Sequence, residues 1–153
     1  MTNKLWFLSL GCLVIVNGLF ILVISFYNQS MSVQKGAHDS VFILILIIMV
    51  AVANFSYFFT QFLNPGIRNL ASITDEEYES EGKSYCSLCK GFRTNNMEHC
   101  SECDVCVEGL DHHCGFFGKC IAGVQKYFFY LFLISICGCF FAMIFAMSST
   151  VGI

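Results

Sequence analysis

Three long stretches of the chain are almost entirely apolar, and polar sequence separates them. They cover residues 5–27, 41–63 and 127–147, and none of them contains Asp, Glu, Lys, Arg or His. About 20 apolar residues are enough for a helix to cross a bilayer. A buried helix of a soluble protein rarely stays uncharged over such a length. Each stretch therefore predicts a transmembrane helix, and the fold class predicted is an α-helical polytopic membrane protein.

The composition agrees with this prediction. Hydrophobic residues make up 56% of the chain and charged residues 12%, whereas a soluble domain carries about a quarter charged residues. The net charge of -3 offers no basic surface for nucleic acid, so no nucleic-acid partner is expected. The stretch 5–27 is longer than the roughly 7–15 apolar residues of a signal peptide, and no clear cleavage site follows it. We therefore expect it to be a retained helix.

The distribution of Lys and Arg predicts the orientation. The loop 28–40 holds only Lys35, whereas the segment between the second and third stretches holds six basic residues, and basic loops stay in the cytosol. We expect a short cytosolic N-terminus at 1–4 and a lumenal or extracellular loop at 28–40. We further expect a cytosolic linker at 64–84, a cytosolic cysteine-rich domain at 85–126 and a lumenal end at 148–153.

Polar residues mark two further features. Asn64-Pro65-Gly66 stops the second apolar stretch, and the five acids between residues 75 and 81 are typical of a solvated linker. Asn17, Asn54 and Gln61 lie inside the apolar stretches. The favoured interpretation is that these amides form hydrogen bonds between helices or lie near a membrane interface, and a substrate site is the alternative.

Cysteine and histidine are concentrated in the central segment. Seven of the ten cysteines and three of the four histidines fall between residues 86 and 120, with the spacing C-x2-C-x9-H-C-x2-C-x2-C-x5-H-H-C-x5-C. Zinc takes four thiolate or imidazole ligands, commonly offered as close pairs such as Cys86/Cys89 and Cys100/Cys103. The reducing cytosol favours metal over disulfides. A disulfide-rich ectodomain is the alternative, but it needs the reversed topology and leaves one cysteine unpaired.

Two zinc ions need eight ligands, and the segment offers ten candidates. Two candidates are therefore left over, and the spacing by itself does not say which. The cluster Asp111-His112-His113-Cys114 thus allows two interpretations. It is either part of a metal site or the place of a cysteine nucleophile beside its own base.

The segments Tyr85 to Cys89, His99 to Cys106, Asp111 to Cys114 and then Cys120 resemble the cysteine-rich domain of the DHHC-type (zinc-finger) protein S-acyltransferases, or palmitoyltransferases. The two apolar stretches before the domain and the Phe-rich one after it agree with that family. Asn64-Pro65-Gly66 is similar to its Asp-Pro-Gly motif. The resemblance implies two structural Zn²⁺ ions, each held by three cysteines and one histidine. One site would comprise Cys86, Cys89, His99 and Cys106, and the other Cys100, Cys103, His113 and Cys120.

The resemblance also implies the chemistry. Cys114 would accept a long-chain acyl group from acyl-CoA, His112 would act as its base, and Asp111 would orient the imidazole. The acyl group would then pass to cysteines of cytosolic or membrane proteins that face the cytosol. The expected partners are long-chain acyl-CoA such as palmitoyl-CoA, membrane lipid and these protein substrates. The expected location is a eukaryotic ER, Golgi or plasma membrane.

The sequence departs from the family pattern around these motifs. Proline and tryptophan are expected after Cys114, but Gly115 and Phe116 stand there, and Lys119 and Gln125 replace expected asparagines. Family members usually have a fourth span, and three are visible here. A catalytically impaired membrane-bound zinc scaffold, or a truncated fragment of such an enzyme, is therefore the alternative to an active transferase.

Overall fold

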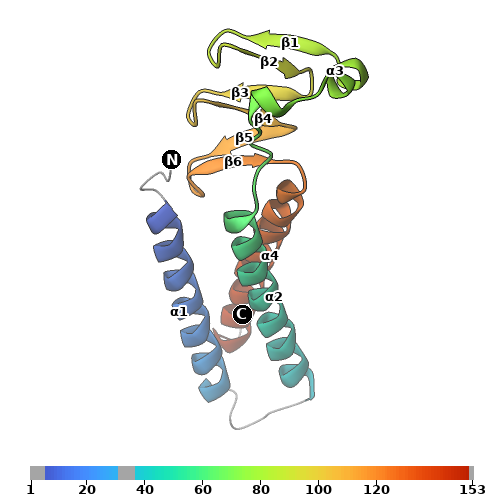
Figure 1. The fold of residues 1–153 in the computed structure, drawn as a ribbon. Coiled ribbons are helices and arrows are strands. Elements are labelled where there is room, and N and C mark those ends of the chain that lie inside the picture. Colours follow the sequence, from blue (N-terminus) through green and yellow to red (C-terminus); the bar gives the residue numbers. More distant parts are fainter. Residues whose placement is uncertain (1–5, 31–36, 152–153) are drawn as a thin grey trace.

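The computed structural model describes residues 6–30 and 37–151, which form a bundle of long helices and a stack of short hairpins (Figure 1). The hairpins lie beyond one end of the bundle, with β5–β6 nearest the helices and β1–β2 farthest from them. Lys4 and Lys35, which enter the predicted orientation, lie outside the described residues.

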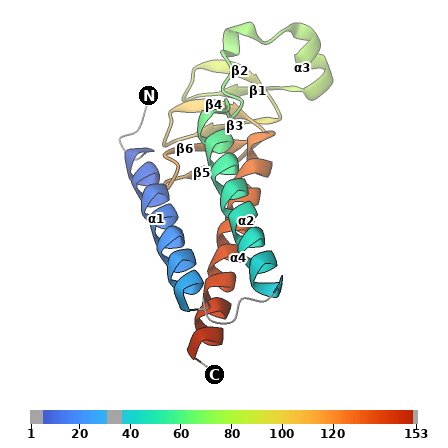
Figure 2. The ribbon, with the colours of Figure 1, turned by 90° about the horizontal axis from the view of Figure 1, so that it is seen from below.

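Three long helices make up the bundle: α1 (Trp6–Ser30), α2 (Ala37–Phe62) and α4 (Gln125–Val151). α2 and α4 share the most extensive contact, and α1 runs alongside both (Figure 2). Within the described residues, two helices are long and apolar enough to cross a membrane, Ser40–Phe62 and Gln125–Phe145. Many large apolar side chains of these helices face outward, which suits contact with lipid.

The linker after α2 contains more regular structure than a solvated linker suggests. A short 3-10 helix, η1 (Leu70–Ser72), precedes the helix α3 (Asp75–Glu81). Thr74 and Glu77 form a reciprocal capping box at the start of α3, with the Thr74 hydroxyl accepting from the Glu77 amide. The acids in its first turn also favour the helix, because they complement its dipole. The acidic run is therefore solvent-exposed but helical, and Thr-x-x-Glu was the overlooked signal.

Each hairpin is a separate two-stranded antiparallel sheet. The three pairs are β1 (Lys83–Cys86) with β2 (Gly91–Thr94), β3 (Met97–Cys100) with β4 (Val105–Glu108), and β5 (Leu110–Cys114) with β6 (Lys119–Ala122). All three close in the same way, because Cys86 pairs with Gly91, Cys100 with Val105 and Cys114 with Lys119. The three hairpins therefore have loops of the same length, four residues each.

Asn64-Pro65-Gly66 joins the helices to the hairpins. The Asn64 side-chain oxygen accepts hydrogen bonds from the amides of Gly66 and Ile67, both at 3.0 Å. The Gly66 carbonyl accepts from the Glu108 amide at 3.1 Å. Gly66 has φ +95°, and a Cβ there would lie 3.0 Å from the Glu108 carbonyl oxygen. Glycine is therefore required where the end of α2 turns onto β4.

Two side chains from the last hairpin and α4 close the end of α2. The last carbonyls of a helix have no partner within it and need donors from elsewhere. The Lys119 ammonium donates to the carbonyls of Gln61 at 2.9 Å and Leu63 at 2.8 Å. The Gln125 amide, 1% exposed, donates to the Thr60 carbonyl. Two departures from the family pattern, Lys119 and Gln125, thus act together at one place.

The amides inside the bundle have different surroundings. Asn17 and Asn54 donate to each other's side-chain oxygens, at 3.1 and 2.8 Å, so the predicted hydrogen bond between helices joins α1 to α2. Gln61 makes no such bond with its side-chain oxygen, which is buried and has no partner among the described residues. The interpretation as an interhelical bond is therefore confirmed for Asn17 and Asn54 only.

Candidate metal centres and nucleophile

The outer cluster joins the β1–β2 turn to the β3–β4 hairpin. Cys86 and Cys89 lie at the end of β1 and in the turn after it, and His99 and Cys106 are cross-strand partners on β3 and β4. His99 Nδ1 lies 3.7 Å from Cys86 Sγ and 3.2 Å from Cys89 Sγ, and Cys106 Sγ lies 3.5 Å from Cys89 Sγ. Residues from two hairpins therefore converge on one point.

The inner cluster repeats this arrangement one hairpin closer to the bundle. Cys100 and Cys103 supply the turn pair, and His113 and Cys120 are the cross-strand pair on β5 and β6. His113 Nδ1 lies 3.6 Å from Cys100 Sγ and 3.3 Å from Cys103 Sγ. The structure thus brings together the two sets of four residues that the family resemblance implied.

The donor sets fit zinc. In each cluster the four ligand atoms lie within 4.8 Å of one another. Ligand bonds of about 2.3 Å to sulfur and 2.0 Å to nitrogen, set tetrahedrally, place neighbouring donors about 3.5–3.8 Å apart. The S···S and S···N distances above lie close to that range. Three thiolates and one imidazole are also a donor set that zinc prefers, so both clusters can hold it.

Electrostatics explains why these thiols need a cation. The backbone amide of Cys89 points at Cys86 Sγ at 3.4 Å, and this hydrogen bond lowers the pKa of Cys86. Burial, together with the neighbouring Cys89 and Cys86 thiols, raises the pKa of Cys106 to about 12. Three thiolates therefore cannot coexist at such distances unless a positive charge lies among them.

A repeat of 14 residues underlies both clusters. Each outer ligand has its inner counterpart 14 positions later, from 86 to 100, 89 to 103, 99 to 113 and 106 to 120. The last residue of each four-residue loop has a left-handed backbone, with φ 53° at Lys90, 54° at Asp104 and 64° at Gly118. This repeat was not predicted from the sequence, although the equal spacing of the two ligand sets is a signal for it.

The repeat places Cys114 at the position of a first turn cysteine in the third hairpin. Position 117, where the second cysteine of a turn pair would stand, is a buried phenylalanine, 1% exposed. No third metal cluster occurs in the part of the chain that the structure describes. Cys114 is half-buried against the apolar cluster that joins β6 to α2 and α4. Cys114 therefore occupies the turn position of a metal ligand but lies outside both metal clusters.

A β-bulge brings Asp111 and His112 together. Neighbouring residues of a regular strand point to opposite faces, so their side chains do not normally meet. In β5 the register shifts, since Leu110 pairs with Ala122 but His112 already pairs with Ile121. A bulge re-aims the extra residue. The Asp111 carboxylate thereby lies 2.9 Å from His112 Nδ1.

Side chains beyond the bulge alternate between the two faces of β5. His112 and Cys114 are two residues apart and share one face of β5, while His113 points to the other face and the inner cluster. The His112 ring packs edge-on against Phe129, with centroids 5.1 Å apart. Hydrogen bonds from His112 and then from the Tyr130 hydroxyl lower the pKa of Asp111, so its carboxylate is ionised.

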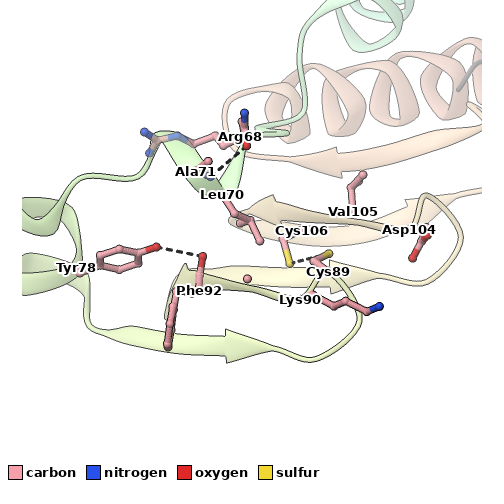
Figure 3. A pocket seen from close by; sticks show the side chains of 12 residues that line it. Arg68, Leu70, Ala71, Tyr78, Cys89, Lys90, Phe92, Asp104, Val105 and Cys106 are labelled. Atoms are coloured by element: carbon pink, nitrogen blue, oxygen red, sulfur yellow. Dashed lines mark hydrogen bonds between the residues drawn. The ribbon is translucent and has the colours of Figure 1, made fainter.

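A groove of about 510 Å³ lies on the outer hairpins (Figure 3), and Cys114 is not among the residues that line it. Residues 68–71 form one wall, and Tyr78 together with residues 89–92 and 104–106 forms the rest. Arg68, one of the two basic residues that line it, is held by Glu77 at 2.6 Å and faces Glu108 at 3.6 Å. The groove also contains Cys89 and Cys106 of the outer cluster, so it belongs to the metal-binding part of the domain.

Comparisons with known proteins find relatives for the segment that carries these residues. A family model described as DHHC palmitoyltransferase matches residues 79–152. The chain is 48% identical to human palmitoyltransferase ZDHHC14 over 52 residues. This match covers 34% of this chain and 11% of ZDHHC14. Palmitoyltransferase ZDHHC9 of Bos taurus and ZDHHC18 of Mus musculus have the same identity over 52 residues. The match covers 14% of the length of either protein, so it spans only a small part of these relatives.

Proposed function

From the match to the DHHC palmitoyltransferase model over residues 79–152, we propose that this chain is a member of that family and a protein S-acyltransferase. It moves a long-chain acyl group, such as palmitate, from acyl-CoA through a Cys114 thioester to cysteines of cytosol-facing proteins. The observation that carries the proposal is the position of Cys114. It lies outside both metal clusters and on the strand face of His112, whose ring nitrogen is held by Asp111.

In the first step, His112 accepts the Cys114 thiol proton, and the thiolate attacks the thioester carbonyl of acyl-CoA. The new S–C bond forms a tetrahedral oxyanion. Collapse of this oxyanion breaks the bond to the CoA sulfur, which takes the proton back from His112 and leaves as free CoA. The hydrogen bond from His112 Nδ1 to Asp111 leaves the other ring nitrogen, Nε2, for these transfers.

In the second step, a cysteine thiol of the protein substrate gives its proton to His112 and attacks the acyl group on Cys114. The thioester bond to Cys114 breaks, and Cys114 recovers a proton from His112. One thioester replaces another in both steps, so neither step needs a redox partner. The same three side chains therefore serve both halves of the reaction.

The two cysteine and histidine clusters have a structural role, because they hold in place the hairpins that carry Cys114. We propose that Cys86, Cys89, His99 and Cys106 hold one Zn²⁺, and that Cys100, Cys103, His113 and Cys120 hold a second. When bound, zinc neutralises the thiolates and fixes the hairpins. All four positions in each cluster are protein ligands, and this is typical of a structural centre. His113 then fixes the strand that presents its neighbour Cys114.

We further propose that α1, α2 and α4 all cross the membrane, with the hairpins on the cytosolic side. This assigns 5–27, 41–63 and 127–147 as spans and 85–126 as the cytosolic zinc domain. Cys114 packs where the last hairpin meets α2 and α4, so its thioester would form at the membrane surface. An acyl chain gains about 0.8 kcal/mol for each CH₂ that leaves water, and this gain favours a site beside lipid.

Labelled palmitoyl-CoA tests the proposal on purified, zinc-loaded protein. We expect hydroxylamine-sensitive label on the chain, loss of that label in Cys114→Ser, and retention of it in Cys137→Ser. Cys137 is a matched control, because it is an exposed cysteine on α4. Metal analysis should give about two zinc ions per chain in the wild type and in Cys114→Ser. Folded, zinc-loaded wild type without label would overturn the proposal and favour a zinc-bearing membrane scaffold.

A further inference from the structure

We propose that Tyr130 is a positioning residue for the acyl transfer, because its hydroxyl holds the Asp111 carboxylate against His112. The Tyr130 hydroxyl donates to Asp111 Oδ2 at 3.0 Å. The same oxygen lies 2.9 Å from His112 Nδ1. One carboxylate oxygen is thus fixed from two sides, by the strand that carries the nucleophile and by helix α4. The inference rests on the proposed function of Cys114.

The Asp111 carboxylate needs such a second contact. Asp111 is the extra residue of a β-bulge, so no strand partner fixes its position. Its side chain is 33% exposed, and that of His112 is 38% exposed, so water competes for the hydrogen bond between them. Two rotatable bonds also let the carboxylate turn away from the ring. A neutral donor on a rigid helix opposes that rotation and adds no charge beside the imidazole.

Helix α4 fixes both members of the pair through adjacent residues. Phe129 packs against the His112 ring at 5.1 Å between centroids, and Tyr130 donates to Asp111. The Phe129 and Tyr130 rings also contact each other, at 5.5 Å between centroids. The pair is therefore held by the beginning of a long apolar helix, and its geometry depends on the seating of the last hairpin on α4.

The test compares Tyr130→Phe with Tyr127→Phe. Tyr127 lies one turn earlier on α4, and its hydroxyl makes no hydrogen bond within the described residues, so its variant controls for the loss of a phenol. We expect Tyr130→Phe to slow acylation of Cys114 about tenfold at saturating palmitoyl-CoA, as for the loss of one hydrogen bond to a charged group. The palmitoyl-CoA concentration for half-maximal rate and the zinc content should not change.

A double-variant comparison separates positioning from a general structural role. Because Tyr130 acts through Asp111, adding Tyr130→Phe to Asp111→Ala should slow the reaction no further. A tenfold loss in both backgrounds, an unchanged rate in the wild-type background, or a change confined to the half-maximal concentration would each overturn the inference.

A second readout does not depend on acyl-CoA. Alkylation of Cys114 by iodoacetamide, followed by peptide mass spectrometry, reports how well His112 activates the thiol. The same pattern is expected: slower alkylation in Tyr130→Phe, no change in Tyr127→Phe, and no further loss beside Asp111→Ala. If this pattern holds while wild-type protein takes no acyl label, the transferase function fails and the positioning role stands. If Tyr130→Phe alkylates at the wild-type rate, the positioning role fails.

Discussion

Replacing Lys119 by methionine removes the ammonium group that closes the end of α2 but keeps most of the side-chain stem. The ammonium donates to the carbonyls of Gln61 at 2.9 Å and Leu63 at 2.8 Å. A hydrogen bond to a charged group contributes about 1.5–3 kcal/mol, so the two together contribute roughly 3–6 kcal/mol. Without Lys119, the hairpin β5–β6 loses its polar attachment to α2 by this side chain.

Part of that contribution is offset by the cost of burying the ammonium. Burial lowers the pKa of Lys119 to about 8, because the charged ammonium loses part of its contact with water there. Methionine avoids this cost and retains apolar contact. We therefore expect the opening free energy of the hairpin to fall by about 2 kcal/mol in Lys119→Met, which corresponds to about a 30-fold change in the opening equilibrium.

Amide hydrogen exchange followed by mass spectrometry measures that change. Amides of residues 110–122 should exchange about 30-fold faster than in the wild type. Amides of residues 83–94 in the outer hairpin should exchange at the wild-type rate. Lys90→Met is the matched control, because it removes an exposed ammonium with no hydrogen bond in the described parts of the chain. Unchanged protection at 110–122, or an equal loss in both hairpins, would refute the reasoning.

Three further substitutions test other parts of the fold. Cys106→Ser should lower the zinc content from two ions to one per chain after a chelator wash, since three protein ligands hold zinc less tightly than four; two retained ions would contradict the assigned ligands. Gly66→Ala should destabilise the joint to β4 by about 1–3 kcal/mol, measured as faster exchange of the Glu108 amide, because φ is +95° there. Asn54→Leu should weaken the contact between α1 and α2 by about 1 kcal/mol, because the Asn17 side-chain oxygen loses the donor that Asn54 supplies; lower cross-linking between the two helices would show this. Equal cross-linking in wild type and variant would show that the amide pair does not hold α1.

Some elements could be predicted from the sequence because their causes are local. An uncharged apolar run forms a long helix whatever surrounds it, and two such runs coincide with helices that can cross a membrane. Each amide inside such a run needs a hydrogen-bond partner, and Asn17 and Asn54 bond to each other. The ligand sets followed from a family resemblance, and the count of two left-over candidates followed from the fourfold coordination of zinc.

Other elements depended on partners far away in the chain. The helix α3 and the repeat of 14 residues did have sequence signals, a Thr-x-x-Glu capping box and equal ligand spacings. The hydrogen bonds from Lys119 to the end of α2 had no sequence signal, because Lys119 lies 58 residues after Gln61, whose carbonyl it binds. The contact between Tyr130 and Asp111 likewise crosses from a helix to a strand.

The letters D-H-H-C show where this division falls. The sequence determined which residue types lie together. That His112 and Cys114 share a face while His113 points away follows only from the strand β5, which the sequence analysis did not predict. Only the tertiary structure decided that Asp111 turns toward His112, because a bulge arises from the pairing of one strand with another. It also decided that α4 holds this pair, since the seating of a hairpin on a helix depends on packing between distant residues and not on local pattern.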